Sequence, residues 1–284
     1  MAEFRRPSVP PWVVLLGILV VTAVWSLFPL YSPRTPGTLH LAVIEGEDPG
    51  TVQRAFGPLI EDLGRSVRRA GVVRIADREA IGDGTHAADL LLVTPDQPMP
   101  DDHEILAWTK PIGRIGLGTP LVLVTRRGQA GPEVRWALGD PSVLGGPEAA
   151  REDLEERGVA LGEAAPIVGR SPYRHDEVIA LLHHAAVDRI VVRRDDVERA
   201  TAAGRLDPEA IRVEVLQPPS PRFALVASPS LSGPARRRLR ARALDLDVLR
   251  LNPRNGSARA VANALGQLGL GGFAPTEPFP SLRP

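Results

Sequence analysis

The order of strands, turns and helices between Arg135 and Val192 restricts the fold more than any other part of this sequence. The short apolar run from Trp136 to Leu138 ends at a Gly-Asp-Pro turn, and a helix is expected from near Pro147 to Gly158. Proline just inside a helix and glycine just after it are common helix boundaries. This segment therefore predicts one strand–turn–helix unit.

A second unit of the same kind follows it. Residues 166–168 predict another short strand, and Asp188 leads directly into a strand over residues 189–192. The helix between them has one apolar face, formed by Val178, Ile179, Leu182 and Ala186. Repeated strand–helix units form parallel sheets, and their ligands bind beyond the carboxyl ends of the strands, where helix N-termini present free N–H groups. We therefore expect a site for a small, anionic molecule.

Four features of this region occur in a fixed order: GDPS, a small-residue turn with its helix, a histidine opening the next helix, and VD before a strand. In this order the chain resembles the phosphate/phosphite/phosphonate substrate-binding proteins of ABC importers. The similarity extends from LHLAVIEGEDPGTVQRAFGPLIEDLGRSV, which begins at Leu39, to GQLGLGGFAP near the C-terminus. It implies an α/β, bilobal fold of the type 2 periplasmic-binding-protein class, with two α/β lobes joined by two crossing strands.

The resemblance also implies where an anion binds. The family's turn usually reads Ser-Thr-Ser-Gly and holds phosphonate oxygens through hydroxyl and backbone N–H groups. This chain has Ser-Val-Leu-Gly over residues 142–145, so two of the three hydroxyls are missing. We expect Ser142, Gly145 and Gly146 to contact the anion. Ordinary turn and capping chemistry explains these residues equally well, and Glu148 in the first helical turn would repel an anion.

Three further residues complete the expected site. His175 matches the family's histidine and would donate to a ligand oxygen, although a capping or surface role fits it equally. Thr94, which follows an apolar strand, would contribute from the other lobe. Asp195 falls near the family's carboxylate, which can receive a ligand amino group. The returning linker of the family often carries small or acidic residues where this chain has Arg222.

The N-terminal segment is the second strong signal. No charged residue occurs between Arg6 and Arg34, and residues 12–30 are almost wholly apolar. Spanning a bilayer takes about 20 apolar residues, whereas the apolar region of a secretory signal has about 7–15. We expect an uncleaved, single-pass anchor in the inner or cytoplasmic membrane, with residues 1–11 in the cytoplasm and the body periplasmic or extracellular. A cleaved signal peptide is the alternative.

The body divides into two expected lobes after a linker over residues 31–37. Lobe one takes residues 38–124 plus 226–284, and lobe two takes residues 125–225. Further expected strands are Leu39–Ile44, Val72–Ile75, Ala88–Val93, Leu121–Thr125 and Phe223–Ala227, and further expected helices are Thr51–Ala70, Pro234–Leu246 and Ser257–Leu268. The glycines between 266 and 272 predict a terminal turn.

Composition excludes several functions. The chain has 34 basic and 34 acidic residues, so no overall positive charge attracts nucleic acid. It has no cysteine, which excludes a lipid-anchored lipoprotein and thiolate metal sites. His183 and His184 follow His175 by two helical turns, about 12 Å, too far to share one zinc ion. We expect no metal, no cofactor and no enzymatic activity, because no Walker loop, dinucleotide fingerprint or nucleophile elbow is present.

The resulting hypothesis is a membrane-anchored extracytoplasmic solute-binding protein that closes its lobes over a small oxyanion and serves the permease of an ABC importer. The alternative is a divergent binding-protein fold that acts as an extracytoplasmic sensor or protein-interaction domain, with a degenerate ligand site. A third reading, an enzyme on the same fold, lacks a nucleophile and base in a suitable context.

Overall fold

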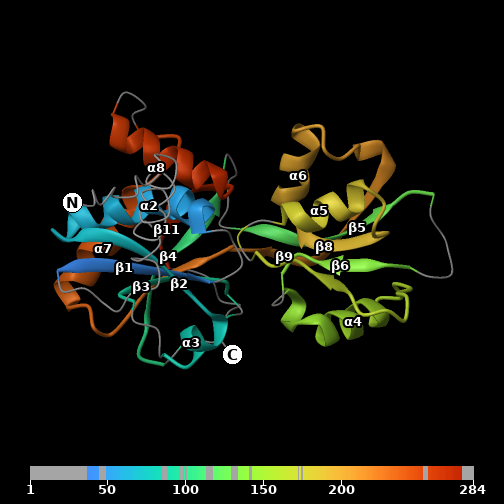
Figure 1. The fold of residues 1–284 in the computed structure, drawn as a ribbon, viewed down its shortest axis with the longest axis horizontal. Helices are drawn as coiled ribbons and strands as arrows, with labels where there is room; N and C mark the ends of the chain where they lie inside the picture. The colour runs from blue at the N-terminus through green and yellow to red at the C-terminus, as the bar shows by residue number, and fades with distance from the viewer. Residues whose placement is uncertain are drawn as a thin grey trace, which may run out of the picture.

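The computed structural model describes most of the chain from residue 37 to residue 276. The described ranges are 37–44, 49–84, 88–95, 97, 99, 101–112, 118–128, 134–140, 143–171, 173, 175–251 and 255–276. Within them the chain forms two α/β lobes, each built on its own sheet and placed side by side (Figure 1). The predicted bilobal α/β organisation is confirmed.

The described residues of lobe one form a six-stranded mixed sheet in the order β11-β4-β10-β3-β1-β2. These strands are β1 (Thr38–Ile44), β2 (Ala70–Ala76), β3 (Leu90–Val93), β4 (Glu104–Pro111), β10 (Ala224–Ala227) and β11 (Leu270–Ala274). β1 is parallel to β2 and β3, whereas β10 runs antiparallel to both β3 and β4. β1 and β3 are buried along almost their whole length, as expected for central strands covered on both faces.

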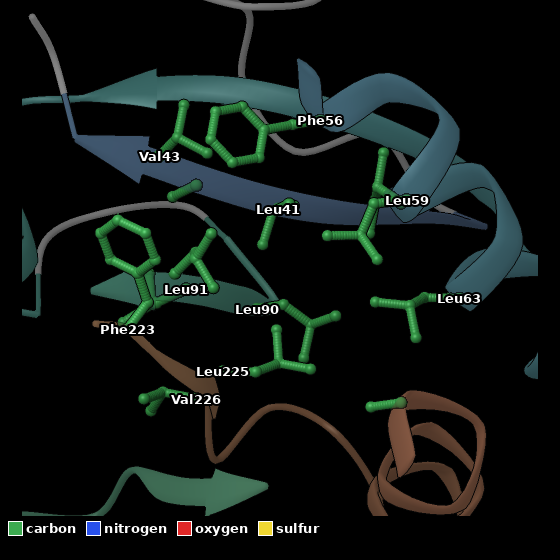
Figure 2. Packing of buried hydrophobic residues seen from close by; sticks show 14 of the residues in the cluster. Leu41, Val43, Phe56, Leu59, Leu63, Leu90, Leu91, Phe223, Leu225 and Val226 are labelled. Carbon is green, nitrogen blue, oxygen red and sulfur yellow. The ribbon is translucent and has the colours of Figure 1, made fainter. Parts of the chain in front are cut away.

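Three helices cover one face of this sheet: α2 (Pro49–Ser66), α7 (Gly233–Asp245) and α8 (Gly256–Gln267). The short α3 (Arg78–Gly82) lies on the opposite side (Figure 1). Figure 2 shows how α2 contributes to the core, because Phe56, Leu59 and Leu63 recur at helical spacing and point toward β1. Burying each such side chain contributes about 1.5–3 kcal/mol, so the apolar face of α2 fixes the helix on the sheet.

Lobe two has a five-stranded sheet among its described residues, in the order β7-β6-β8-β5-β9. Its strands are β5 (Thr119–Arg126), β6 (Trp136–Leu138), β7 (Ile167–Val168), β8 (Arg189–Arg193) and β9 (Ile211–Ser220). A 3₁₀ turn (Val143–Gly145) precedes α4 (Pro147–Glu156) on one face, and α5 (Asp176–His183) and α6 (Arg194–Ala202) cover the other (Figure 1). β6 is parallel to β7 and β8, which confirms the parallel arrangement predicted for this region.

Two crossings join the lobes, one from β4 to β5 and one from β9 to β10. They touch where Gly118 lies against Ser220, since a Cβ atom on Gly118 would approach the Ser220 backbone to 2.2 Å. The lobe boundary expected at 124/125 falls inside β5, whose partners β8 and β9 belong to lobe two. The boundary expected at 225/226 likewise falls inside β10. The sheets place both boundaries in the crossings, because a strand cannot be divided from its hydrogen-bonded neighbours.

Other differences from the sequence predictions concern the two ends of the chain. The terminal turn expected from the glycines between 266 and 272 is present at residues 268–269, but the expectation is wrong for Gly271 and Gly272, because β11 passes through them and pairs with β4. The predicted anchor at residues 12–30 lies outside the described residues. Among the helices of the described ranges, none is long and apolar enough to cross a membrane.

Candidate functional site

The carboxyl edges of the two sheets meet where the two lobes contact each other, and we call this boundary the cleft. On the lobe-one side, Ile44 ends β1 and Thr94 follows β3, while Asp140 follows β6 on the lobe-two side. Two of the contacts that join these edges involve Arg78 and Tyr173. Arg78 of α3 lies 3.8 Å from Asp140, and the hydroxyl of Tyr173, from the segment between β7 and α5, lies 2.6 Å from the backbone nitrogen of Ile44. The cleft therefore lies where parallel sheets place their ligands.

A buried group of charged side chains lines the lobe-two side. We call it the ionic cluster, and its members are Asp140, His175, Asp195, Asp196, Arg199 and Arg222. The ring of His175 is 2% exposed; its Nδ1 lies 3.0 Å from Oδ2 of Asp196 and its Nε2 lies 3.6 Å from Oδ2 of Asp140. Both ring nitrogens of this histidine thus face carboxylates of the chain itself.

The charges around His175 and Asp196 favour the ionised forms of both side chains. Burial alone would lower the pKa of His175, but the charge of Asp196 and the carboxylate acceptors of Asp140 and Asp196 beside the ring outweigh it and raise that pKa above its ordinary value. Burial would raise the pKa of Asp196, yet the charges of Arg222 and His175 hold it far below its ordinary range. The same carboxylates raise the pKa of the Arg222 guanidinium, so it is always charged.

Arg222 connects the ionic cluster to the crossing between β9 and β10. Its guanidinium donates to Oδ2 of Asp195 at 3.2 Å, to Oδ1 of Asp196 at 3.0 Å and to the carbonyl oxygen of Tyr173 at 2.6 Å. The guanidinium has five N–H donors in one plane, which suits it to bridging several acceptors. Arg222 thereby ties one crossing, the start of α6 and the Tyr173 segment into one unit.

Asp195 and Arg193 bind the end of the other crossing, which runs from β4 to β5. The hydroxyl of Thr119, at the start of β5, donates to Oδ1 of Asp195 at 3.1 Å. The guanidinium of Arg193 donates to the carbonyl oxygens of Thr119 and Ser220, so it joins the two crossings at their closest approach. The two oxygens of Asp195 thus already accept hydrogen bonds from Thr119 and Arg222.

The expected anion-binding turn is described only in part. Ser142 lies outside the described residues. Gly145 and Gly146 both have positive φ, +83° and +112°, and Gly146 directly precedes α4 as its N-terminal cap. The N–H of Gly146 donates to the carbonyl oxygen of Val143 at 3.1 Å, so the turn itself uses this amide.

Thr94 is a predicted site residue with a buried polar atom that has no hydrogen-bond partner among the described residues, as is also true of His175 at its Nε2. Thr94 is 5% exposed, and the atom concerned is its Oγ1. Gln97, which the sequence reasoning did not identify, is equally buried; its Nε2 donates to the carbonyl oxygen of Arg78 at 3.1 Å, and its Oε1 has no partner within the described ranges. Buried polar atoms normally find partners, and such exceptions in a cleft indicate a site.

Charged side chains of both signs gather at the cleft. Arg78, Arg199 and Arg222 lie against Asp140, Asp195 and Asp196, and His175 lies against Asp140 and Asp196. Arg78 is the cation best placed for a ligand, because its side chain is 28% exposed and its ion pair with Asp140 is long. Neither Arg78 nor Gln97 was identified by sequence reasoning, since nothing near either residue forms a motif.

Sequence comparison assigns the chain to a family. The profile of the ABC transporter, phosphonate, periplasmic substrate-binding protein family matches residues 122–278, which is more than half of the chain. The chain belongs to this family. The resemblance inferred from the order of GDPS, the histidine and VD is confirmed. No curated protein matches the sequence significantly.

Solved structures agree with this family of phosphonate substrate-binding proteins in fold. PhnD1 from Prochlorococcus marinus, in complex with methylphosphonate, has a TM-score of 0.62 and 14% identity, over 86% of this chain and 94% of that one. A binding protein component of an ABC phosphonate transporter from Pseudomonas aeruginosa has a TM-score of 0.60 and 16% identity, over 84% and 81%. XAC2383 from Xanthomonas citri, bound to chloride, has a TM-score of 0.59 and 17% identity, over 85% and 92%.

Proposed function

We propose that this family member binds a small oxyanion, such as phosphate, phosphite or a phosphonate, in the cleft between its lobes. Family membership supports a role in solute binding for an ABC importer rather than in catalysis. The observation that carries the proposal is the buried Thr94 Oγ1, which has no hydrogen-bond partner in the described part of the chain, in a cleft that also holds the partly exposed Arg78. A hydroxyl and a guanidinium are the groups that bind oxyanions in proteins.

The geometry also supports different roles for the residues of the cleft, some in positioning and others in ligand contact. His175 and Asp195, which the resemblance assigns to ligand contact, are bonded within the ionic cluster. We propose that they hold the hinge and the helix starts in position, and that lobe one, through Thr94 and Arg78, makes the first contacts with the anion. Ser142 and Gly145 then complete the site from the turn before α4. Asp195 would receive an amino group only from a ligand that displaces one of its present partners.

We further propose that residues 12–30 anchor this binding protein in the membrane, with the lobes on the periplasmic or extracellular side. The sequence from Arg6 to Arg34 supports this, because an uncharged segment of that length suits a span better than a signal peptide. A tether of this kind would keep the lobes near an importer's permease. Protease accessibility of the lobes in spheroplasts, but not in intact cells, is the expected result; a cleaved N-terminus in the mature chain would contradict it.

Ligand binding is tested on the full chain in lipid nanodiscs by thermal unfolding against phosphate, phosphite, methylphosphonate, sulfate and acetate. A ligand at 100-fold over its Kd stabilises the native state by about 2.7 kcal/mol. At about 2–4 °C per kcal/mol for a protein of this size, the midpoint rises by about 5–10 °C. A shift with one tetrahedral oxyanion supports the proposal, and no shift with any of the five contradicts it.

A matched pair of arginine variants assigns the binding to the cleft. Arg78→Gln removes the partly exposed cation beside Asp140, whereas Arg250→Gln removes a cation that is 86% exposed on the surface of lobe one. We expect the first variant to lose the thermal shift and the second to keep it. Equal shifts in both would exclude the cleft as the binding site.

One observation favours the alternative, an extracytoplasmic sensor or protein-interaction domain. The ring of His175 is enclosed by Asp140 and Asp196, and the family's turn lacks two hydroxyls, so several expected ligand contacts are internal contacts here. Genes for a permease and an ATPase beside this gene would favour the importer, whereas genes for a signalling protein would favour the sensor.

A further inference from the structure

Tyr173 belongs to lobe two by its position in the chain but to lobe one by its contacts. The residue lies between β7 and α5, both of lobe two. Its side chain is nevertheless fully buried, at 0% exposure, and it packs in the hydrophobic core of lobe one. A side chain from one lobe that completes the core of the other is a direct mechanical link across the cleft.

The hydroxyl of Tyr173 both accepts and donates a hydrogen bond. It accepts from the backbone N–H of Ile44 at 2.6 Å and donates to the backbone oxygen of Leu92 at 3.1 Å. Ile44 is the last residue of β1, and Leu92 is the penultimate residue of β3, the parallel neighbour of β1. The phenol thus bonds to backbone groups at the carboxyl edge, where this class of sheet presents groups to a ligand.

The ring of Tyr173 lies between two aromatic side chains of lobe one. Phe56 of α2 contacts it edge-on, with centroids 4.9 Å apart at 67°, and Phe223 contacts it at 5.1 Å and 45°. Figure 2 shows these two phenylalanines projecting from opposite sides toward Val43 and Leu91. The backbone of Tyr173 is fixed in turn, because its carbonyl oxygen accepts from Arg222. The site for the phenol is therefore built for shape and for hydrogen bonding.

We infer that Tyr173 is an internal ligand of the cleft, which holds the two lobes closed by inserting its phenol between β1, β3, Phe56 and Phe223. All the contacts belong to the chain itself, so closure needs no solute. The lobes separate only when this phenol leaves its site, and entry of a solute is therefore coupled to withdrawal of Tyr173. The coupling between solute entry and withdrawal of Tyr173 rests on the proposed oxyanion-binding function. The closure of the lobes by Tyr173 does not depend on that function.

Closure is measured as a distance between two labels, one on each lobe. The labels attach only to the introduced cysteines, because the chain has no cysteine of its own. Glu79 of α3 and Glu148 of α4 are exposed and lie on helices of opposite lobes. Spin labels on the full chain carrying Glu79→Cys and Glu148→Cys report the separation by pulsed electron resonance, in buffer without any oxyanion. We expect one narrow, short distance for the otherwise native chain.

Three variants test the role of the phenol. Tyr173→Ala should give a broad distribution shifted to longer distances, because it removes the ring and both hydrogen bonds. Addition of 4-methylphenol, which has the ring and hydroxyl of tyrosine, should restore the short distance, because it fills the space that the truncated side chain leaves beside Phe56 and Phe223. Tyr173→Phe should open only in part and should not respond to 4-methylphenol, since its ring fills the site. Tyr31 is the only other tyrosine, so a Tyr31→Phe control should behave as the native chain.

An unchanged short distance in Tyr173→Ala would overturn the inference, as would a long distance that 4-methylphenol does not shorten. If Tyr173→Ala fails to fold, recovery of the folded state by 4-methylphenol supports the inference, and the partial opening of Tyr173→Phe decides it independently. The distances are measured without oxyanion, so their outcome is separate from the ligand panel. A chain that closes through Tyr173 but binds none of the five anions would contradict the proposed function alone.

Discussion

Nδ1 of His175 and Oδ2 of Asp196 lie 3.0 Å apart, and both side chains are 2% exposed. The two residues open α5 and α6, the helices that cover one face of lobe two, so their contact joins two helix starts at the carboxyl edge of the sheet. A histidine held between carboxylates responds to pH in the range where its unfolded counterpart titrates. The pair therefore links the stability of lobe two to pH.

The raised pKa of His175 sets the direction of that dependence. Because the folded protein binds the proton more tightly than the unfolded chain, the stabilisation is complete below about pH 6.5 and is lost as pH rises through the higher native pKa. We expect the urea midpoint to fall as pH rises above about 6.5. His175→Gln should remove this decline, while His183→Gln, at an exposed position of α5, should retain it. A native chain whose midpoint is constant over this range would contradict the assignment.

Replacement of Arg222 should be severely destabilising. Arg222→Met preserves much of the side-chain volume but leaves Asp195 and Asp196 buried without their main cation. Removing one partner of a buried ion pair costs about 3–5 kcal/mol. Urea denaturation of Arg222→Met should show a loss of this size, whereas Arg250→Met, on the surface, should lie within about 0.5 kcal/mol of the native chain. The further change Asp196→Asn should recover part of the loss, since it removes a charge that Arg222 neutralised.

Much of the fold was predictable from local patterns. Short apolar runs bounded by glycine or proline gave β1, β3, β5, β6, β8 and β10, and apolar residues at helical spacing gave α2, α5 and α8. β9 was missed because most of its residues are exposed and two are prolines, so it shows no apolar run. β11 was missed because its two consecutive glycines are typical of a turn.

The candidate site was less accessible to sequence reasoning, because its partners are distant in the chain. Thr94, His175 and Asp195 were located by order and resemblance. Their bonding could not be read from the sequence: Tyr173 lies 129 positions from Ile44 and 81 from Leu92. Which carboxylate faces His175 depends on how β6 and β8 align in the sheet, and sequence periodicity does not determine that alignment.

The same glycines that concealed β11 make a stability prediction. Gly272 has φ +137°, and a Cβ atom there would lie 2.0 Å from the carbonyl oxygen of Leu246. Gly272→Ala should therefore destabilise the chain by at least about 1–3 kcal/mol, the usual cost of overpacking. Gly256→Ala, at the start of α8 with no atom within 4 Å of the added methyl, should be neutral or slightly stabilising. Chemical denaturation of the two variants distinguishes them, and equal stabilities would contradict the close approach of β11 to Leu246.

The Thr94→Val substitution should weaken ligand binding but leave the stability of the chain unchanged or increased. Its buried Oγ1 has no partner among the described residues, so Thr94→Val removes an unsatisfied polar atom while keeping the shape of the side chain. An unsatisfied buried group costs about 1–3 kcal/mol, and we expect the variant to be as stable as the native chain or more stable. If the hydroxyl binds the oxyanion, calorimetry should show a loss of affinity of about 10-fold, equivalent to about 1.4 kcal/mol.

Thr109→Val is the matched control, because the hydroxyl of Thr109 bonds to the backbone of Phe223 at 2.9 and 3.1 Å. That variant should lose stability, and native affinity with reduced stability in Thr94→Val would show that its hydroxyl is structural.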